Sequence, residues 1–348
     1  MKSVWITVAM AVVLGGLGAY LYFVELPSER TKTATETQDK KLLSFEEQDI
    51  TGLTVKTEVG EVVLVPDEKR AWKITAPLAT DADSREVEAL LRALVLGRIS
   101  RVVEEQAAAL GPFGLEKPAT VLTVTAGSRV ETLSVGGSGP ISSTLYAMRA
   151  SDKKILLTNL APKDVLNKTL LALRKKEVLR VDQAKADRLR LAYPASELVL
   201  YRTEQGGQAG PAAGQGKKTW MLRYPIEAAA DQAEVNNLLI KIESLKALGF
   251  VDQGPQHDAL LQKLTKPDAK MTLRADGVDQ TVKLYQLDPA TGEAYAVTTA
   301  DAPIYRINPL VIKDLTKELF TLQDKRLLGV PMDELAMLTV KTRDQQYT

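Results

Sequence analysis

The sequence predicts an α+β protein in which a single N-terminal transmembrane helix precedes two tandem, duplicated units of mostly antiparallel sheet plus helices. The first observation is an internal repeat, because the segments Trp72-Lys-Ile-Thr-Ala-Pro77 and Trp220-Met-Leu-Arg-Tyr-Pro225 begin 148 residues apart. The second is a run of 21 residues, 4–24, that carries no charge. Similarity at a fixed period indicates a repeat architecture, and about 20 apolar residues are enough to span a bilayer.

The repeat continues into the helix expected after each tryptophan. Matching positions are occupied by Asp83, Val87, Leu90, Leu91 and Leu94 in the first copy, and by Asp231, Val235, Leu238, Leu239 and Ile242 in the second. Both copies therefore share one hydrophobic skeleton, and we expect Trp72, Pro77, Trp220 and Pro225 to mark the repeat core. Each tryptophan should pack its strand against the helix that follows it.

Composition narrows the possible functions. The chain has 348 residues, a net charge of +1, one His and no Cys. A nearly neutral chain shows no basic footprint for nucleic acid. The lack of Cys excludes disulfides, thiolate zinc sites and Cys nucleophiles, and it suits an exported protein. A single His leaves too few ligands for a transition-metal cluster, so we expect no metal and no cofactor.

Residues 1–26 are predicted to form an uncleaved membrane anchor. Trp5 lies near one end of the uncharged run, and Tyr20 and Tyr22 lie near the other, as interfacial aromatic residues do. A cleaved signal peptide has a shorter apolar region, about 7–15 residues long, and a cleavage site flanked by small residues. Neither feature fits this segment.

The expected location is the bacterial inner membrane, crossed once, with the bulk of the chain in the periplasm. Lys2 favours a cytoplasmic N-terminus, and the lack of Cys suits export. Cations that follow the span count against this orientation; they are Arg30, Lys32, Lys40 and Lys41.

A stripe of small residues runs along the predicted span. Ala11, Gly15 and Ala19 recur every four residues and so share one face of a helix. Small side chains let two helices approach closely in lipid, so we expect this face to pack against a helix of a membrane partner.

The remainder of the chain divides by composition and by the repeat. Residues 27–44 are predicted to be a flexible tether because the segment is mostly polar and charged. We expect repeat unit 1 over residues 45–180 and repeat unit 2 over residues 181–330. Leu338 and Val340 repeat the spacing of Leu189 and Leu191. Residues 331–348 are therefore either the start of a third unit or a strand that closes the second.

Within each unit the pattern predicts strands, a helix, further strands and a closing helix. Alternation of apolar and polar residues predicts strands at 50–57, 62–65 and 72–74. An N-capped amphipathic helix should begin near Ser84, and shorter strands are expected near 99–104, 120–126, 130–135, 144–149 and 154–158. A second helix is expected over 161–178. Unit 2 repeats this order, with a loop rich in Gly, Ala and Gln inserted at 204–218.

No catalytic set is evident in either copy. His257 lies in a polar stretch, so we expect it on the surface. The run Gly136-Gly137-Ser138-Gly139 is followed by Pro140 and a strand, whereas a phosphate loop needs a helix there, so we expect a hairpin connection. Ser151 and Lys154 have an S-x-x-K spacing, but the motifs that accompany it in penicillin-binding enzymes are missing. The carboxylate pairs show no sign of burial, which acid–base catalysis requires.

These residues resemble a known bacterial family. The membrane span, the repeated W-x-(I/L)-x-x-P segment, the following Asp and the V-x-x-L-L-x-x-(L/I) helix together resemble the family described as domain of unknown function 4340. Proteins of this family are similar to partners encoded beside gliding-motility-type ABC transporter components. The resemblance implies an envelope accessory subunit whose soluble part lies outside the cytoplasm. It implies no catalytic residues.

We therefore expect a non-enzymatic, membrane-anchored accessory or scaffold subunit of an ABC-transporter-type envelope complex. Its expected partners are a transporter permease or related membrane subunit and membrane lipid, with the periplasmic repeats contacting partner subunits or cargo. The alternative is a periplasmic lipid- or glycan-binding module. An envelope hydrolase is the third hypothesis.

Overall fold

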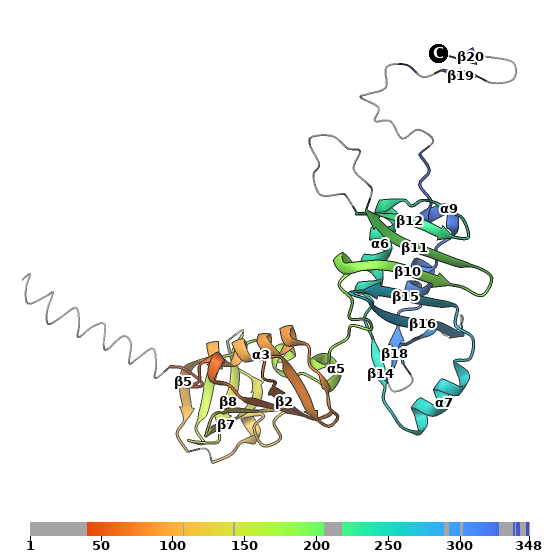
Figure 1. The fold of residues 1–348 in the computed structure, drawn as a ribbon. Coiled ribbons are helices and arrows are strands. Elements are labelled where there is room, and N and C mark those ends of the chain that lie inside the picture. The colour runs from red at the N-terminus through yellow and green to blue at the C-terminus, as the bar shows by residue number, and fades with distance from the viewer. Residues whose placement is uncertain are drawn as a thin grey trace, which may run out of the picture. The chain divides into compact units, whose positions relative to one another are not determined.

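A computed structural model describes residues 40–106, 108–141, 143–204, 218–288, 292–299 and 302–326, followed by 337, 339–341 and 346–347. The chain divides between Lys175 and Lys176 into two compact units (Figure 1). The predicted membrane helix at 4–24, with Ala11, Gly15 and Ala19, lies outside the described residues. Among the helices that the structure describes, none is both long enough and apolar enough to cross a membrane.

The first unit is built on one nine-stranded sheet in which every pairing is antiparallel. Its strands are β1 (Gly52–Thr57), β2 (Gly60–Pro66), β3 (Trp72–Ala76), β4 (Thr80–Asp81), β5 (Arg98–Glu104), β6 (Thr120–Ala126), β7 (Arg129–Ser138), β8 (Leu145–Arg149) and β9 (Ile155–Asn159). Their spatial order is β4-β3-β2-β1-β6-β7-β8-β9-β5.

The second unit repeats this sheet strand for strand. Its strands are β10 (Ala186–Ala192), β11 (Glu197–Glu204), β12 (Lys218–Tyr224), β13 (Ala228–Ala229), β14 (Gly249–Val251), β15 (Ala269–Ala275), β16 (Val278–Asp288), β17 (Glu293–Val297) and β18 (Ile304–Ile307). Their order is β13-β12-β11-β10-β15-β16-β17-β18-β14, again antiparallel throughout. The predicted α+β class and the tandem arrangement of duplicated antiparallel units are confirmed.

The duplication extends to the strand register. Leu53 pairs with Leu64 and Val124, and at the equivalent place in unit 2 Leu189 pairs with Leu200 and Leu273. Alternate residues of these strands are buried, so one face of each sheet carries the core. The loop predicted at 204–218 joins β11 to β12, whose terminal residues Glu204 and Lys218 pair with each other. Residues 205–217 lie outside the described part.

The helix after each tryptophan covers the core face. In unit 1, α3 (Ser84–Leu96) begins at Asp83, whose carboxylate accepts a hydrogen bond from the amide of Arg85. In unit 2, α6 (Gln232–Glu243) begins in the same way at Asp231. Such caps satisfy amide groups that the first turn of a helix leaves unpaired. The predicted apolar positions of both helices are the buried ones, as their spacing on one helix face requires.

The closing helix predicted at 161–178 is wrong. The structure has two single-turn helices, α4 (Lys163–Leu166) and α5 (Leu170–Leu173), and the hydroxyl of Thr169 caps the second of them. Beyond α5 the chain is extended: the backbone amide of Asp83 donates to the Leu173 carbonyl, and the backbone amide of Lys175 donates to the Asp81 carbonyl. Long-range pairing with the segment before α3 thus replaces the last turns of the predicted helix. Unit 2 also closes with two short helices, α8 (Leu310–Leu315) and α9 (Leu319–Leu322).

Among the residues that the structure describes, the opposite face of each sheet is covered at one end alone. In unit 2, α7 (Pro255–Lys263) lies beside β14 and β18, and its Leu260 and Leu261 pack against a cluster that contains Tyr285 and Tyr295 (Figure 1). In unit 1 the equivalent end is met by a loop with one 3₁₀ turn, η3 (Gly111–Phe113), whose Phe113 ring makes an edge-on contact with Tyr146. The rest of this face, in both units, carries half-buried and exposed side chains. We call it the open face.

The glycine run at 136–139 was predicted to be a hairpin connection. The structure corrects this, because β7 continues through Ser138. A Cβ atom added at Gly136 would lie 2.3 Å from the Phe113 carbonyl oxygen, so the glycine lets the η3 loop lie against the strand. The hairpin then closes where Gly139 donates to the carbonyl of Thr144.

At the C-terminal end, β19 (Val340–Lys341) pairs with β20 (Gln346–Tyr347) in a separate two-stranded sheet.

Candidate functional site

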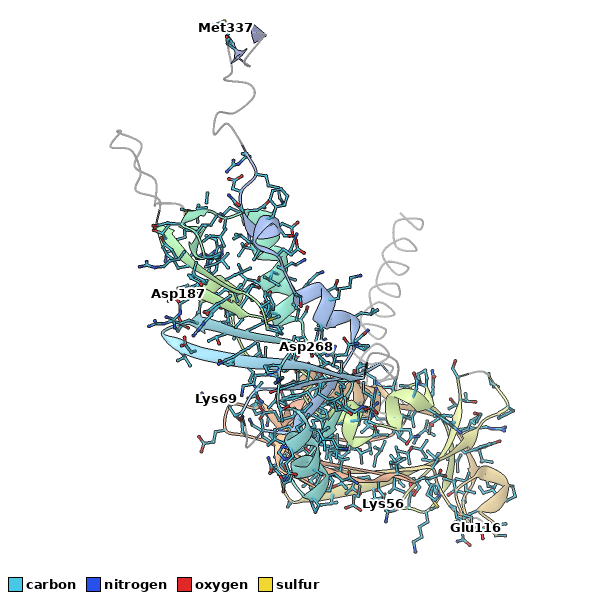
Figure 2. The ribbon with its side chains drawn as sticks, turned by 90° about the vertical axis from the view of Figure 1, so that its right-hand side faces the viewer. Lys56, Lys69, Glu116, Asp187, Asp268 and Met337 are labelled. Carbon is cyan, nitrogen blue, oxygen red and sulfur yellow. The ribbon has the colours of Figure 1, made fainter. Side chains whose placement is uncertain are left out.

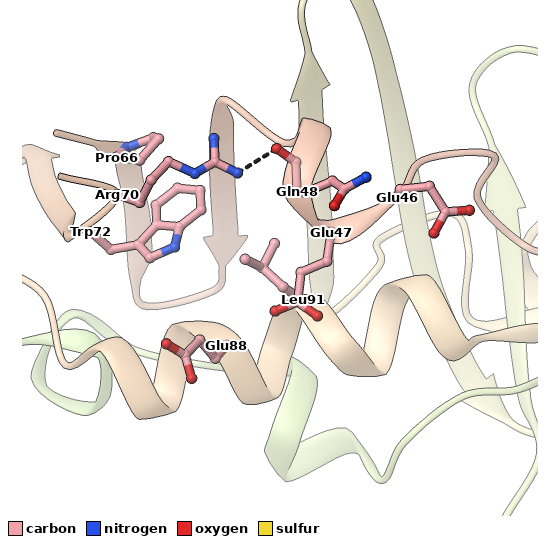
Figure 3. A pocket seen from close by; sticks show the side chains of 8 residues that line it. All are labelled: Glu46, Glu47, Gln48, Pro66, Arg70, Trp72, Glu88 and Leu91. Carbon is pink, nitrogen blue, oxygen red and sulfur yellow. Dashed lines mark hydrogen bonds between the residues drawn. The ribbon is translucent and has the colours of Figure 1, made fainter. Parts of the chain in front are cut away.

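A cavity of about 400 Å³ opens beside Trp72 in the first unit (Figure 3). It is lined by side chains from the 3₁₀ turn η2 (Glu47–Asp49) and the residue before it, from β2 and the β2–β3 loop, from Trp72 itself and from α3. These residues are Glu46, Glu47, Gln48, Pro66, Arg70, Trp72, Glu88 and Leu91. The repeat motif thus contributes to a concave surface as well as to the core.

The β2–β3 loop places Arg70 over this cavity. The Asp67 carboxylate accepts hydrogen bonds from the amides of Lys69 and Ala71, both at 2.9 Å, and so closes a tight turn. Arg70 takes a left-handed backbone conformation with φ of 65°. Its guanidinium lies beside the indole of Trp72 and donates to the carbonyl of Gln48 (Figure 3).

The rim of the cavity is acidic. Glu46, Glu47 and Glu88 line the cavity together with one guanidinium, that of Arg70. Glu46 also pairs with Lys41 at 3.3 Å, and Glu88 pairs with Arg92 at 3.6 Å. Carboxylates beside an aromatic edge suit hydroxyl groups or a cation. The Trp72 side chain has only 8 % of its surface exposed, so the ring presents an edge and no open stacking surface.

Unit 2 has the same arrangement with a different arginine. Trp220, 1 % exposed, lies opposite Arg202 in the β11–β12 ladder, where unit 1 pairs Trp72 with Pro66. The guanidinium carbon of Arg202 is 5.7 Å from the indole centre, and the group donates to the carbonyl of Ala184 at 2.8 Å. Ala184 belongs to the 3₁₀ turn η4 (Gln183–Lys185), the counterpart of η2.

Both units therefore place a guanidinium between the tryptophan and a 3₁₀-turn carbonyl, but they take it from different chain positions. Sequence analysis missed both arginines. The offset of 136 residues that relates Leu53 to Leu189 also relates Pro66 to Arg202, so the signal for Arg202 was present. Nothing in the repeat could have identified Arg70, because a loop of another length carries it.

The prolines and the histidine lie elsewhere. Pro77 and Pro225 follow cis peptide bonds and are exposed, so they lie outside the core that they were expected to mark. They belong to the turns after β3 and β12.

His257, expected on the surface, is 2 % exposed. Its Nε2 lies 3.2 Å from the Ala302 carbonyl and its Nδ1 3.1 Å from Asp258, because α7 packs on the sheet and encloses the ring.

The open faces of the two units differ in charge. In unit 2 the alternate positions of β10, β15 and β16 on this face are half-buried or exposed, and they hold Arg188, Arg190, Lys270, Arg274 and Lys283. At the equivalent positions unit 1 has Gly52, Thr54, Val121, Thr125 and Ser134. One polar contact is kept in both: Thr123 Oγ1 lies 3.0 Å from Thr132 Oγ1, and Thr272 Oγ1 lies 2.9 Å from Thr281 Oγ1.

The described residues do not assemble a recognisable catalytic centre. Across the parts of the chain that the structure describes, no three His, Cys, Asp or Glu side chains are grouped closely enough to hold a metal ion. Ser151 lies in the exposed turn between β8 and β9, where neighbouring Asp152 pairs with Arg149. Side chains such as Lys56, Lys69, Asp187 and Asp268 point outward from the two units (Figure 2).

Comparison with known proteins gives one family. The domain of unknown function DUF4340 matches residues 72–263 and again residues 220–348, so the two matches begin at the equivalent tryptophans Trp72 and Trp220. No curated protein and no solved structure matches the chain. Because the two matches together cover more than half of the sequence, this chain belongs to the DUF4340 family.

Proposed function

We propose that this protein is a non-enzymatic accessory subunit of an ABC-transporter-type envelope complex. Residues 1–26 anchor it in the inner membrane, and the two repeat units lie in the periplasm, where they contact a partner subunit. The transporter assignment comes from the likeness to proteins encoded beside gliding-motility-type components.

One observation carries the scaffold role. The two units keep the same strand order, register and helix caps, yet their open faces have different chemistry: cationic on β10, β15 and β16, and rich in Val and Thr on β1, β6 and β7. In a duplicated scaffold the core is held constant by packing, while exposed positions are free to diverge toward different partners. Two sheet faces that differ in this way suit a subunit with two separate contacts.

Co-purification tests the transporter assignment. The full-length chain, tagged at its C-terminus, is extracted from native membranes with a mild detergent, and the proteins recovered with it are identified by mass spectrometry. We expect the permease of an ABC transporter among them. Recovery of the tagged chain without any transporter subunit would contradict the proposal.

A matched pair of anchor variants tests how the contact is made. Gly15→Leu adds a large side chain to the Ala11, Gly15 and Ala19 stripe, whereas Val13→Leu adds bulk off the stripe. Close helix packing requires small residues at the contact, so Gly15→Leu should reduce the recovered permease and Val13→Leu should not. Equal recovery with both variants would indicate that the repeats, and not the anchor, contact the permease.

Topology is tested with a single cysteine, since the chain has none. Ser128 lies exposed in the turn between β6 and β7. In intact spheroplasts, Ser128→Cys should react with a membrane-impermeant maleimide. Labelling that requires lysis would place the repeats in the cytoplasm and contradict the proposed orientation.

The cavity beside Trp72 favours a second candidate, a periplasmic glycan-binding module. Carboxylates and an amide around an aromatic edge are groups that hydrogen-bond sugar hydroxyls. Calorimetric titration with soluble cell-wall and exopolysaccharide fragments tests it, with Glu88→Gln as the variant expected to weaken binding. Binding that the Glu88 variant leaves unchanged would exclude this cavity.

A further inference from the structure

We infer that the open face of the second unit, on strands β10, β15 and β16, is a docking surface for an extended acidic polypeptide segment of a partner protein. This inference deepens the proposed function and rests on it only for the existence of a partner. The chemistry of the segment follows from the side chains of the face.

The face carries positive charge that it does not neutralise. Arg188 pairs with Asp279 at 2.9 Å, and Arg190 pairs with Glu197. In the described part of the chain, no ion pair joins Lys270, Arg274 or Lys283 to a carboxylate within 4.0 Å. These three side chains lie on one face of two adjacent strands, and we call them the β15–β16 cationic group.

One pair within the β15–β16 cationic group works against the stability of the sheet. Lys270 and Lys283 are direct cross-strand partners, and like charges in that position destabilise a strand pair. Arg274 lies opposite Asp279 on β16 and opposite Arg188 on β10. Asp279 pairs with Arg188, and the Nε of Arg274 is buried without a hydrogen-bond partner among the described residues. Unit 1 builds the same sheet with Val121, Thr125 and Ser134 at these places, so the fold itself does not need the charges.

The spacing fits an extended segment. Lys270, Thr272 and Arg274 are alternate residues of β15 and point to one face, so successive side chains are about 7 Å apart. An extended peptide repeats its own side chains at the same interval. Acidic residues four positions apart in such a peptide would therefore meet Lys270 and Arg274 together, with the residue midway between them facing Thr272.

The position of α7 favours a narrow partner over a membrane surface. Alternation along β16 puts Tyr285 on the same face as Thr281 and Lys283, and α7 packs over Tyr285. A planar bilayer would meet this helix before it reached the cations, which stand on strands and not on protruding loops. A single extended chain can lie beside α7 without that obstruction.

The inference is tested with full-length protein in detergent and two fluorescent peptides, one of alternating Glu and Thr and one of alternating Gln and Thr. Fluorescence anisotropy should show binding of the Glu/Thr peptide alone, and binding should weaken as salt is raised, because salt screens exposed charges. Equal binding of both peptides, or none of either, would overturn the inference. So would tighter binding to phosphatidylglycerol vesicles than to the Glu/Thr peptide.

Variants assign the binding to the face. The triple change Lys270→Gln, Arg274→Gln and Lys283→Gln should weaken the Glu/Thr peptide about tenfold or more. A matched control removes the same charge from exposed residues outside β10, β15 and β16 with Lys241→Gln, Lys246→Gln and Lys313→Gln, and it should bind as the parent does. A control that weakens binding equally would show only a net-charge effect and overturn the assignment.

A variant with reversed charges distinguishes a change in binding from a loss of folding, because it should gain binding to a different peptide. Lys270→Glu with Lys283→Glu should exchange the preference, so that a Lys/Thr peptide binds and the Glu/Thr peptide does not. A folded reversal variant that still prefers the Glu/Thr peptide would overturn the inference. If peptide binding fails while transporter subunits co-purify, the inference falls and the proposed function stands. If the peptide binds and no transporter subunit co-purifies, the docking surface stands and the transporter assignment falls.

Discussion

Arg202 lies opposite Trp220 in the β11–β12 ladder, with its guanidinium carbon 5.7 Å from the centre of the indole ring. The same group donates to the carbonyl of Ala184, so one side chain joins the strand, the tryptophan and the 3₁₀ turn before the sheet. Unit 1 reaches an equivalent contact from a loop, through Arg70 and Gln48. This difference leads to the first prediction.

Arg202→Met should destabilise the protein by about 1–3 kcal/mol, because it leaves the Ala184 and Ala186 carbonyls without this donor. Arg70→Met should cost less, about 0.5 kcal/mol, because Arg70 is exposed and water replaces it. Urea unfolding of the full-length chain, followed by far-UV circular dichroism, measures both. The reverse ranking would mean that the loop arginine is the structural one.

Trp72→Ala and Trp220→Ala should each cost about 3–5 kcal/mol, as large-to-small changes in a core do. Both side chains are buried, and Trp220 is the more enclosed of the two, so its loss should be at least as large. Thermal melts of both variants test this, with Trp→Phe at each position as the milder control. A variant that melts like the parent would identify its tryptophan as a surface residue.

Gly136→Ala should destabilise unit 1 by about 1–3 kcal/mol, since its methyl group would collide with the Phe113 carbonyl oxygen and the Leu115 side chain. Gly137→Ala is the matched control, because its nearest neighbour is an ordinary 3.4 Å from the added atom. Urea unfolding midpoints distinguish the two. Equal midpoints would show that the η3 loop moves away from β7 at no cost.

Asp324 should remain ionised to unusually low pH. A hydrogen bond from the Arg326 side chain lowers the pKa of this carboxyl from 3.8 to about 2, with a further contribution from the Arg326 amide. A depressed folded-state pKa gives stability that is present above pH 3.8 and is lost as the pH falls towards 2.

Carbon-detected NMR titration of the Asp324 carboxyl measures this pKa. Arg326→Gln removes the donor and should return the pKa towards 3.8, while Lys325→Gln, one residue away, should leave it low. An Asp324 that titrates near 3.8 in the parent protein would contradict the bond.

The sequence determined the repeat and much of its local structure. Helix caps at Asp83 and Asp231, and buried Leu91 and Leu239 after them, follow from local hydrogen bonding and from helical spacing, both of which act within a few residues. The alternation of apolar and polar residues predicted the strands for the same reason, because this pattern is also local. The family match at Trp72 and Trp220 then confirms the likeness that the repeat suggested.

Only the tertiary structure decided what depends on contacts between distant segments. Residues 161–178 do not form the predicted continuous helix, because the backbone around Leu173 and Lys175 pairs with the segment before α3. His257 is buried because α7 packs on the sheet. Arg70 lies at the cavity beside Trp72 because of the β2–β3 turn, which the sequence repeat does not predict. The cationic face of unit 2 also needed the register, since residues far apart in sequence, such as Arg188 and Arg274, become neighbours only when β10 pairs with β15. Local patterns determine elements, and pairing between them determines sites.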